Sequence, residues 1–238
     1  MLQRALFIVF TTVLTLPIIL GQTDYQPLVV EEAHWKMCRR LPDDIWPCGR
    51  IFEYYIKGDT IIESVAYKHL YIRSFVSNGE PGGEWNSYDW PLELDYEALV
   101  GFIREDVSDH KVYWRDAPNY ETCGSGPEEM LLYDFAVQVG DTVQTCLHTD
   151  YTVIVEDIVE EEHYGALRTV YYLTDGFRMI TGIGYETGLL VAPFIPLHIT
   201  LDNIIDYCVG NDMDCGVVHN GDMINPYREW HLINESYG

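Results

Sequence analysis

The segment Val65-Ala66-Tyr67-Lys68-His69-Leu70-Tyr71-Ile72-Arg73-Ser74-Phe75 is the stretch that most directly decides the fold. Apolar and polar side chains alternate along it, and it is rich in the β-branched and aromatic residues that favour strands. Similar segments occupy residues 50–57, 99–105, 111–115, 130–137, 151–159, 167–174 and 177–183. These segments predict a chain that is built mainly from short β-strands.

The residues between these segments are those that make turns. Gly58-Asp59 and Gly140-Asp141 each begin the triplet Gly-Asp-Thr, which we interpret as the same turn used twice, ending one strand and opening the next. Polar turns are also expected at residues 106–110 and in the acidic segment 160–165, and Asp175-Gly176 is a strong hairpin dipeptide. Strands joined in this way predict an all-β, mainly antiparallel meander that forms a barrel or a strongly curled sheet.

One long loop is expected around residues 77–94, where Gly, Pro, Trp and acidic residues interrupt the strand pattern. Its aromatic residues Trp85, Tyr88 and Trp90 could bind a ligand, because exposed rings stack on sugars or contact a partner. The alternative is that they fold back as a small cluster over one end of the sheet, which is the common behaviour of loop aromatics.

The N-terminus has the layout of a secretory signal peptide. Arg4 precedes an apolar run over residues 5–20, which is shorter than the roughly 20 residues that span a bilayer and contains Pro17. We expect cleavage after Gly21, then a single β-rich domain over residues 22–216 and a polar extension over residues 217–238. The protein is therefore expected to be secreted, either extracellular or periplasmic, and without a membrane span once the signal is removed.

Six cysteines follow, and an even number in an exported chain favours disulfides. Pairing by proximity gives Cys38–Cys48, Cys123–Cys146 and Cys208–Cys215. Zinc ligation is the competing interpretation, but the paired spacing of zinc sites is missing. Asn211-Asp212-Met213-Asp214-Cys215-Gly216 resembles a calcium loop only superficially, and a disulfide-closed turn explains it better.

The chain is strongly acidic, with 38 Asp and Glu against 14 Lys and Arg and a net charge of −24. A field of this sign repels nucleic acid. Its eight histidines form no zinc motif, no Gly-x-Ser-x-Gly elbow occurs, and Gly182-x-Gly184 opens no expected helix. The sequence thus indicates no catalytic residues, no metal and no cofactor.

Several short motifs, taken in order, resemble a large group of uncharacterised secreted proteins of Bacteroidota. They are residues 31–35, 58–61 with 67–71, 100–106 with 111–114, 131–135 with 139–143, and 182–184 with 188–190. The similarity covers roughly residues 25–208. It implies a β-rich protein of the cell surface or exterior, of the kind often linked to type IX secretion sorting tails or lipoprotein anchors. It implies no catalytic residues, and we expect no sorting tail after residue 238.

These observations predict a non-catalytic domain with a binding or structural role at the cell envelope. Its partner would be a small ligand, a glycan or an envelope protein. The alternative is a secreted hydrolase whose site assembles acidic residues and histidines from distant parts of the chain.

Overall fold

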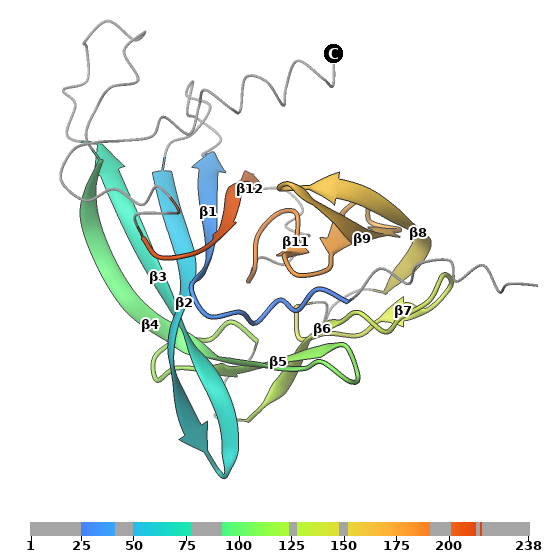
Figure 1. The fold of residues 1–238 in the computed structure, drawn as a ribbon, viewed down its shortest axis with the longest axis horizontal. Coiled ribbons are helices and arrows are strands. Elements are labelled where there is room, and N and C mark those ends of the chain that lie inside the picture. Colours follow the sequence, from blue (N-terminus) through green and yellow to red (C-terminus); the bar gives the residue numbers. More distant parts are fainter. Residues whose placement is uncertain are drawn as a thin grey trace, which may run out of the picture.

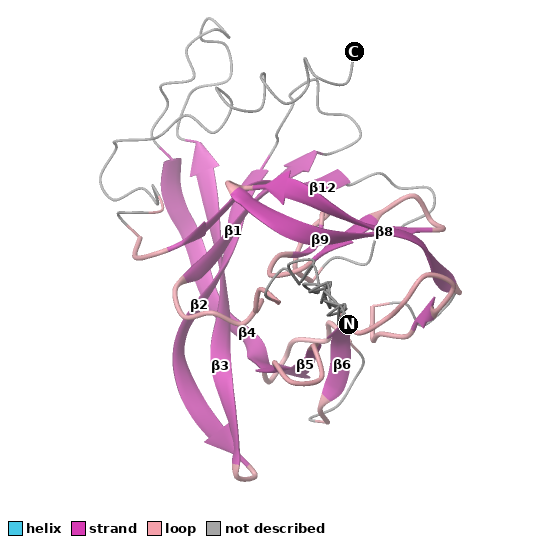
Figure 2. Ribbon diagram, turned by 45° about the vertical axis from the view of Figure 1, so that its right-hand side comes forward, coloured by secondary structure: helices cyan, strands magenta, loops and turns pink. Residues whose placement is uncertain are grey.

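Antiparallel strands make up all the regular secondary structure in the part of the chain that the computed structural model describes, which is residues 25–40, 50–77, 92–123, 128–147, 152–190, 201–212 and 215. The predicted all-β class is confirmed. The strands form two strongly curled sheets, each a half-barrel (Figures 1 and 2).

The larger sheet has seven strands in the order β12-β1-β2-β3-β4-β5-β6. Their bounds are β1 (Ala33–Arg40), β2 (Arg50–Ile62), β3 (Val65–Ser77), β4 (Leu92–Asp106), β5 (Lys111–Asp116), β6 (Met130–Asp134) and β12 (Leu201–Val209). Strands that follow one another in sequence therefore lie side by side, and only β12 returns from the far end of the chain to pair with β1.

The smaller sheet has five strands in the order β11-β10-β9-β8-β7. Their bounds are β7 (Thr142–Val143), β8 (Val153–His163), β9 (Ala166–Leu173), β10 (Arg178–Ile180) and β11 (Gly184–Tyr185). The turns predicted at residues 106–110 and at Asp175-Gly176 are both present, and each joins two antiparallel strands.

The two Gly-Asp-Thr triplets do different things, which corrects the expectation of one shared turn. Gly58 has a φ of 76° and lies in a β-bulge between Ile56 and Asp59, so β2 continues to Ile62 instead of ending. Gly140-Asp141 does form a tight turn, in which the Asp141 amide bonds to the Gln138 carbonyl at 2.9 Å. The same need for a positive φ serves a bulge in one place and a turn in the other.

The acidic turn expected over residues 160–165 is also shorter than predicted. Glu160, Glu161 and Glu162 all belong to β8 and pair with residues of β9. Only Tyr164 and Gly165, with φ values of 49° and 73°, make the turn. Similarly, the loop expected over residues 77–94 is shorter at both ends, because Ser77 pairs with Leu92. Its central part, residues 78–91, lies outside the described residues.

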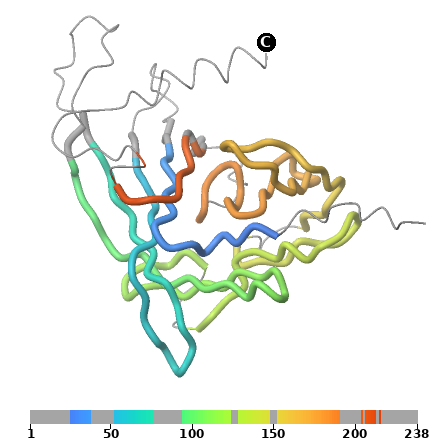
Figure 3. The backbone as a smooth tube through the Cα atoms, in the orientation of Figure 1, coloured from blue at the N-terminus to red at the C-terminus, as the bar shows by residue number. Residues whose placement is uncertain are grey.

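The core lies between the two sheets, and its hydrophobic cluster takes residues from both. Buried polar groups of aromatic side chains join them: Trp35 Nε1 donates to the Ile183 carbonyl at 2.8 Å, and the Tyr133 hydroxyl donates to the Leu189 carbonyl at 2.5 Å. These hydrogen bonds satisfy the polar ends of large buried rings. The segment before β1 runs between the sheets as well (blue in Figure 3), and Gln26 donates to the Leu167 carbonyl.

Candidate functional site

A strip of charged side chains crosses β1, β2 and β3 on the face opposite the core. Glu53 on β2 lies directly across from Arg73 on β3 and from Lys36 on β1. His34 precedes Lys36 by two residues on β1 and therefore lies on the same face. Because side chains alternate along a strand, these residues point away from the face that carries Trp35. The strip is nevertheless buried: His34, Glu53 and Arg73 are exposed by only 2%, 1% and 5%.

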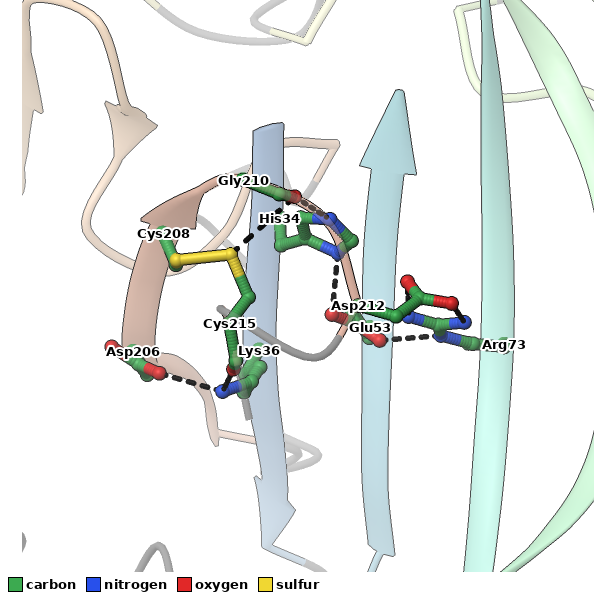
Figure 4. Close-up of a disulfide and its surroundings, with 9 residues drawn as sticks. All are labelled: His34, Lys36, Glu53, Arg73, Asp206, Cys208, Gly210, Asp212 and Cys215. Atoms are coloured by element: carbon green, nitrogen blue, oxygen red, sulfur yellow. Dashed lines mark hydrogen bonds and ion pairs between the residues drawn. A yellow bond between two sulfur atoms is a disulfide. The ribbon is translucent and has the colours of Figure 1, made fainter. Parts of the chain in front are cut away.

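Glu53 is the centre of this strip (Figure 4). Its Oε1 lies 2.9 Å from Nδ1 of His34, and its Oε2 accepts a hydrogen bond from Nε of Arg73 at 2.5 Å. A buried carboxylate is costly unless it is paired and hydrogen-bonded, and both of its oxygens have such a partner here.

A loop that follows β12 covers the strip. We call residues 210–212 together with Cys215 the Cys208–Cys215 loop, because the disulfide from Cys208, near the end of β12, to Cys215 closes it. The Gly210 carbonyl accepts from Nε2 of His34 at 2.9 Å, and the Asp212 carboxylate accepts from Nη2 and Nη1 of Arg73 at 2.9 and 3.4 Å. Each of these contacts joins the loop to a strand more than 100 residues away in sequence.

Lys36 adds a further attachment on the same face. Its Nζ donates to Oδ2 of Asp206 on β12 at 2.8 Å and to the Cys215 carbonyl in the loop. Within the loop, the Cys215 amide bonds to the Asn211 carbonyl at 3.0 Å. The expected disulfide between Cys208 and Cys215 is present, whereas residues 213, 214 and 216 of the expected turn lie outside the described residues.

Aromatic rings flank the charges. The guanidinium of Arg73 lies 4.5 Å from the centroid of the Tyr55 ring, which stacks in turn on Tyr71 at 5.3 Å. Burial opposes the charge of Arg73, but its bonds to Asp212 and Glu53 outweigh burial and raise its pKa. Burial also raises the pKa of Tyr55, and its hydrogen bond to Glu97 acts in the same direction.

The arrangement limits what these groups can do chemically. Both ring nitrogens of His34 are already engaged, Nδ1 with a carboxylate oxygen of Glu53 and Nε2 with the Gly210 carbonyl, each at 2.9 Å. Neither His34 nor Glu53 presents an unoccupied, exposed atom to a substrate. The network is suited to holding the loop and the sheet together.

A second charged cluster lies further along β3 and β4. Arg104 donates to both oxygens of Glu129, at 2.6 and 2.5 Å, and the Tyr67 hydroxyl donates to the same carboxylate. The guanidinium also lies 4.0 Å from the centroid of the Tyr113 ring. Burial pushes the pKa of Glu129 upward, but the bonds from Arg104 and Tyr67 outweigh it, and the pKa is lowered.

The predicted site residues are only partly placed. Cys123–Cys146 and Cys208–Cys215 form disulfides as expected. Cys48, the side chain of Cys38, and the aromatic residues Trp85, Tyr88 and Trp90 lie outside the described residues. No group of three or more potential metal ligands occurs among the residues that the structure describes.

The sequence alone does not predict that Glu53, Arg73, His34 and Asp212 form one group. A signal was present, since Glu53 and Arg73 are charged residues in strands otherwise rich in apolar and aromatic side chains. Their pairing, however, depends on the register of three strands and on the path of a loop near residue 210.

Comparison with protein-family models, curated proteins and solved structures found no match for this chain. Within its described part, the chain contains no helix that is long and apolar enough to cross a membrane. Any account of function must therefore start from the geometry described above.

Proposed function

We propose that this chain is an exported β-domain protein with a non-catalytic role, either binding or structural, at the cell envelope. The observation that carries the proposal is the mutual saturation of His34, Glu53 and Arg73. Their polar atoms bond to one another and to the Cys208–Cys215 loop, at exposures of 5% or less. Groups in this state stabilise a fold and are poorly placed to attack a substrate.

Export is supported by three independent features. The N-terminal residues have signal-peptide character, the chain is acidic, and two disulfides form among the described cysteines. Disulfides persist in oxidising compartments and are rare in the cytosol. The extracellular space and the periplasm are both compatible with these features.

The proposal includes membership in the group of secreted Bacteroidota proteins that the chain resembles. Many residues of the shared motifs lie in the core, including Trp35, Ile103, Trp114, Tyr133 and Ile183. Motifs made of core residues specify a fold and do not indicate a catalytic activity. This agrees with the resemblance, which implies no catalytic residues.

The alternative, a hydrolase, is favoured by one observation. A histidine and two carboxylates from distant parts of the chain do form one network: Glu53 and Asp212 both bond to Arg73, and His34 bonds to Glu53. If the Cys208–Cys215 loop opened, this set could act on a substrate.

A panel of chromogenic glycosides, esters and phosphoesters, together with a labelled casein, separates the two functions. The proposal expects no turnover above that of an inactive preparation, for the wild type and for Glu53→Gln alike. Turnover that persists in Glu31→Gln but disappears in Glu53→Gln, measured at a temperature at which circular dichroism shows both variants to be folded, would establish the hydrolase instead. Glu31 is a suitable control because it forms a partly exposed pair with Lys68.

We also propose Trp85, Tyr88 and Trp90 as ligand contacts, with a small ligand or a glycan as the partner. A titration with soluble oligosaccharides, followed by tryptophan fluorescence, tests this directly. A saturable change that is lost in the Trp85→Ala/Trp90→Ala variant supports the assignment. An unchanged titration in that variant excludes Trp85 and Trp90.

A further inference from the structure

We propose that the outer edge of the Arg73 guanidinium is a carboxylate-binding site, which the chain fills with its own Asp212. This inference rests on the proposed function, because it names a ligand class for a binding protein. The site consists of the Arg73 fork, the Tyr55 ring beneath it and the Glu53 carboxylate that orients it.

Two contacts orient the Arg73 side chain. Its inner Nε is bonded to Glu53 at 2.5 Å, and its cationic plane lies 4.5 Å from the Tyr55 ring centroid. These two contacts fix the side chain from inside the sheet, so that Nη1 and Nη2 both face the loop. A guanidinium fixed in this way is preorganised for a planar carboxylate, which it can bind with two parallel bonds.

The Asp212 carboxylate occupies the position in front of the Arg73 guanidinium. Asp212 accepts both outer N–H groups, at 2.9 and 3.4 Å, and its side chain keeps 30% exposure while that of Arg73 keeps 7%. The carboxylate therefore approaches from the solvent side and covers the buried cation. It comes from a loop and not from a neighbouring strand, so the sheet part of the site exists independently of its occupant.

Three contacts hold the loop that carries Asp212. The Cys208–Cys215 disulfide, the His34 bond to Gly210 and the Lys36 bond to Cys215 all keep the loop against the sheet. A tethered carboxylate competes with a free one through its effective concentration, which falls as the tether loosens. A carboxylate on a small acid or on an acidic residue of a partner protein would bind when the loop lifts.

Chemical rescue tests this site. In Asp212→Gly, the removed side chain has the size of acetate, so 200 mM sodium acetate should raise the Tm by ~3 °C or more above 200 mM sodium chloride. The same comparison on the wild type should give a shift near zero. Asp212→Asn should also give none, because the amide still fills the position.

Two further variants keep the test decisive. Arg73→Met/Asp212→Gly should show no acetate-specific shift. Cys208→Ser/Cys215→Ser should show a smaller shift than Asp212→Gly, because its loop is retained but loosened, and it provides the readout if Asp212→Gly fails to fold. N-acetyl-aspartate N-methylamide, compared with acetate, distinguishes a residue of a partner from a small acid as the natural source.

An equal response to acetate in the wild type, in Asp212→Gly and in the double variant lacking Arg73 would overturn the inference. That result would leave the non-catalytic function intact, since the substrate panel tests it separately. Conversely, turnover that depends on Glu53 would overturn the proposed function whatever acetate does.

Discussion

Arg73 donates its Nε hydrogen to Oε2 of Glu53 at 2.5 Å, across a directly opposed pair of residues on β2 and β3. Both side chains are almost fully buried. A charged pair in this position adds stability only if its remaining hydrogen-bonding groups are also satisfied. His34 and Asp212 provide those partners, and for this reason the loop after β12 belongs to the same structural unit as the sheet.

The disulfides can be checked by chemical labelling. Protein recovered from the exported fraction and denatured without reductant should leave Cys123, Cys146, Cys208 and Cys215 unmodified by iodoacetamide, since their sulfurs are bonded in pairs. The same sample after reduction should be modified at all four positions, as shown by peptide mass spectrometry. Full modification before reduction would refute the crosslinks and weaken the case for export.

Acid should destabilise the protein partly through Glu129. Its pKa is lowered in the folded state by Arg104 and Tyr67, so its contribution is fully present above the unfolded value of about 4.5 and is lost as the pH falls through the lower folded value. The free energy of unfolding, measured by urea titration, should therefore fall as the pH is lowered below the unfolded value, and less steeply in Glu129→Gln.

The neighbouring Glu128 is a matched control, because it is exposed. Glu128→Gln should keep the pH dependence of the wild type. A slope in Glu129→Gln as steep as that of the wild type would show that the pair with Arg104 does not depress this pKa.

Gly101 should not tolerate a side chain. A Cβ added there would lie 2.2 Å from Cζ2 of Trp114 and 2.5 Å from the Arg115 carbonyl oxygen. Gly101→Ala should reduce the free energy of unfolding by about 1–3 kcal/mol, the usual cost of overpacking. Combined with Trp114→Phe, which removes the nearest ring atoms, the loss should be smaller than the sum of the two single losses; additive losses would contradict the close approach.

Local signals explain which parts of the fold were predictable. The turn at residues 106–110 and the Asp175-Gly176 turn depend on a few adjacent residues, and the sequence predicts both. The predicted strands do not include β1, although Ala33, Trp35 and Met37 alternate with His34 and Lys36 in the pattern of a strand. β12 was also missed, because its Leu201–Val209 segment mixes acidic and apolar residues without a clean period.

The candidate site was less predictable for a physical reason. Gly58 satisfies a turn and a bulge equally well, and only the pairing of β2 with β3 decides between them. That pairing also places Arg73 beside Glu53. Asp212, which bonds to Arg73, lies 139 residues away from it in sequence. Contacts of this range follow from strand register and loop path, which no local pattern encodes.

The claim that these charges hold the fold together is tested most directly by a double-mutant cycle on Glu53 and Arg73, measured as the free energy of unfolding in urea. Each of Glu53→Gln and Arg73→Met should lose about 3 kcal/mol or more, because each leaves a buried partner uncompensated. The double variant should lose less than the sum by about 2 kcal/mol. Losses that add to within about 0.5 kcal/mol, or single variants as stable as the wild type, would contradict the account, since residues kept for catalysis often cost stability and do not supply it.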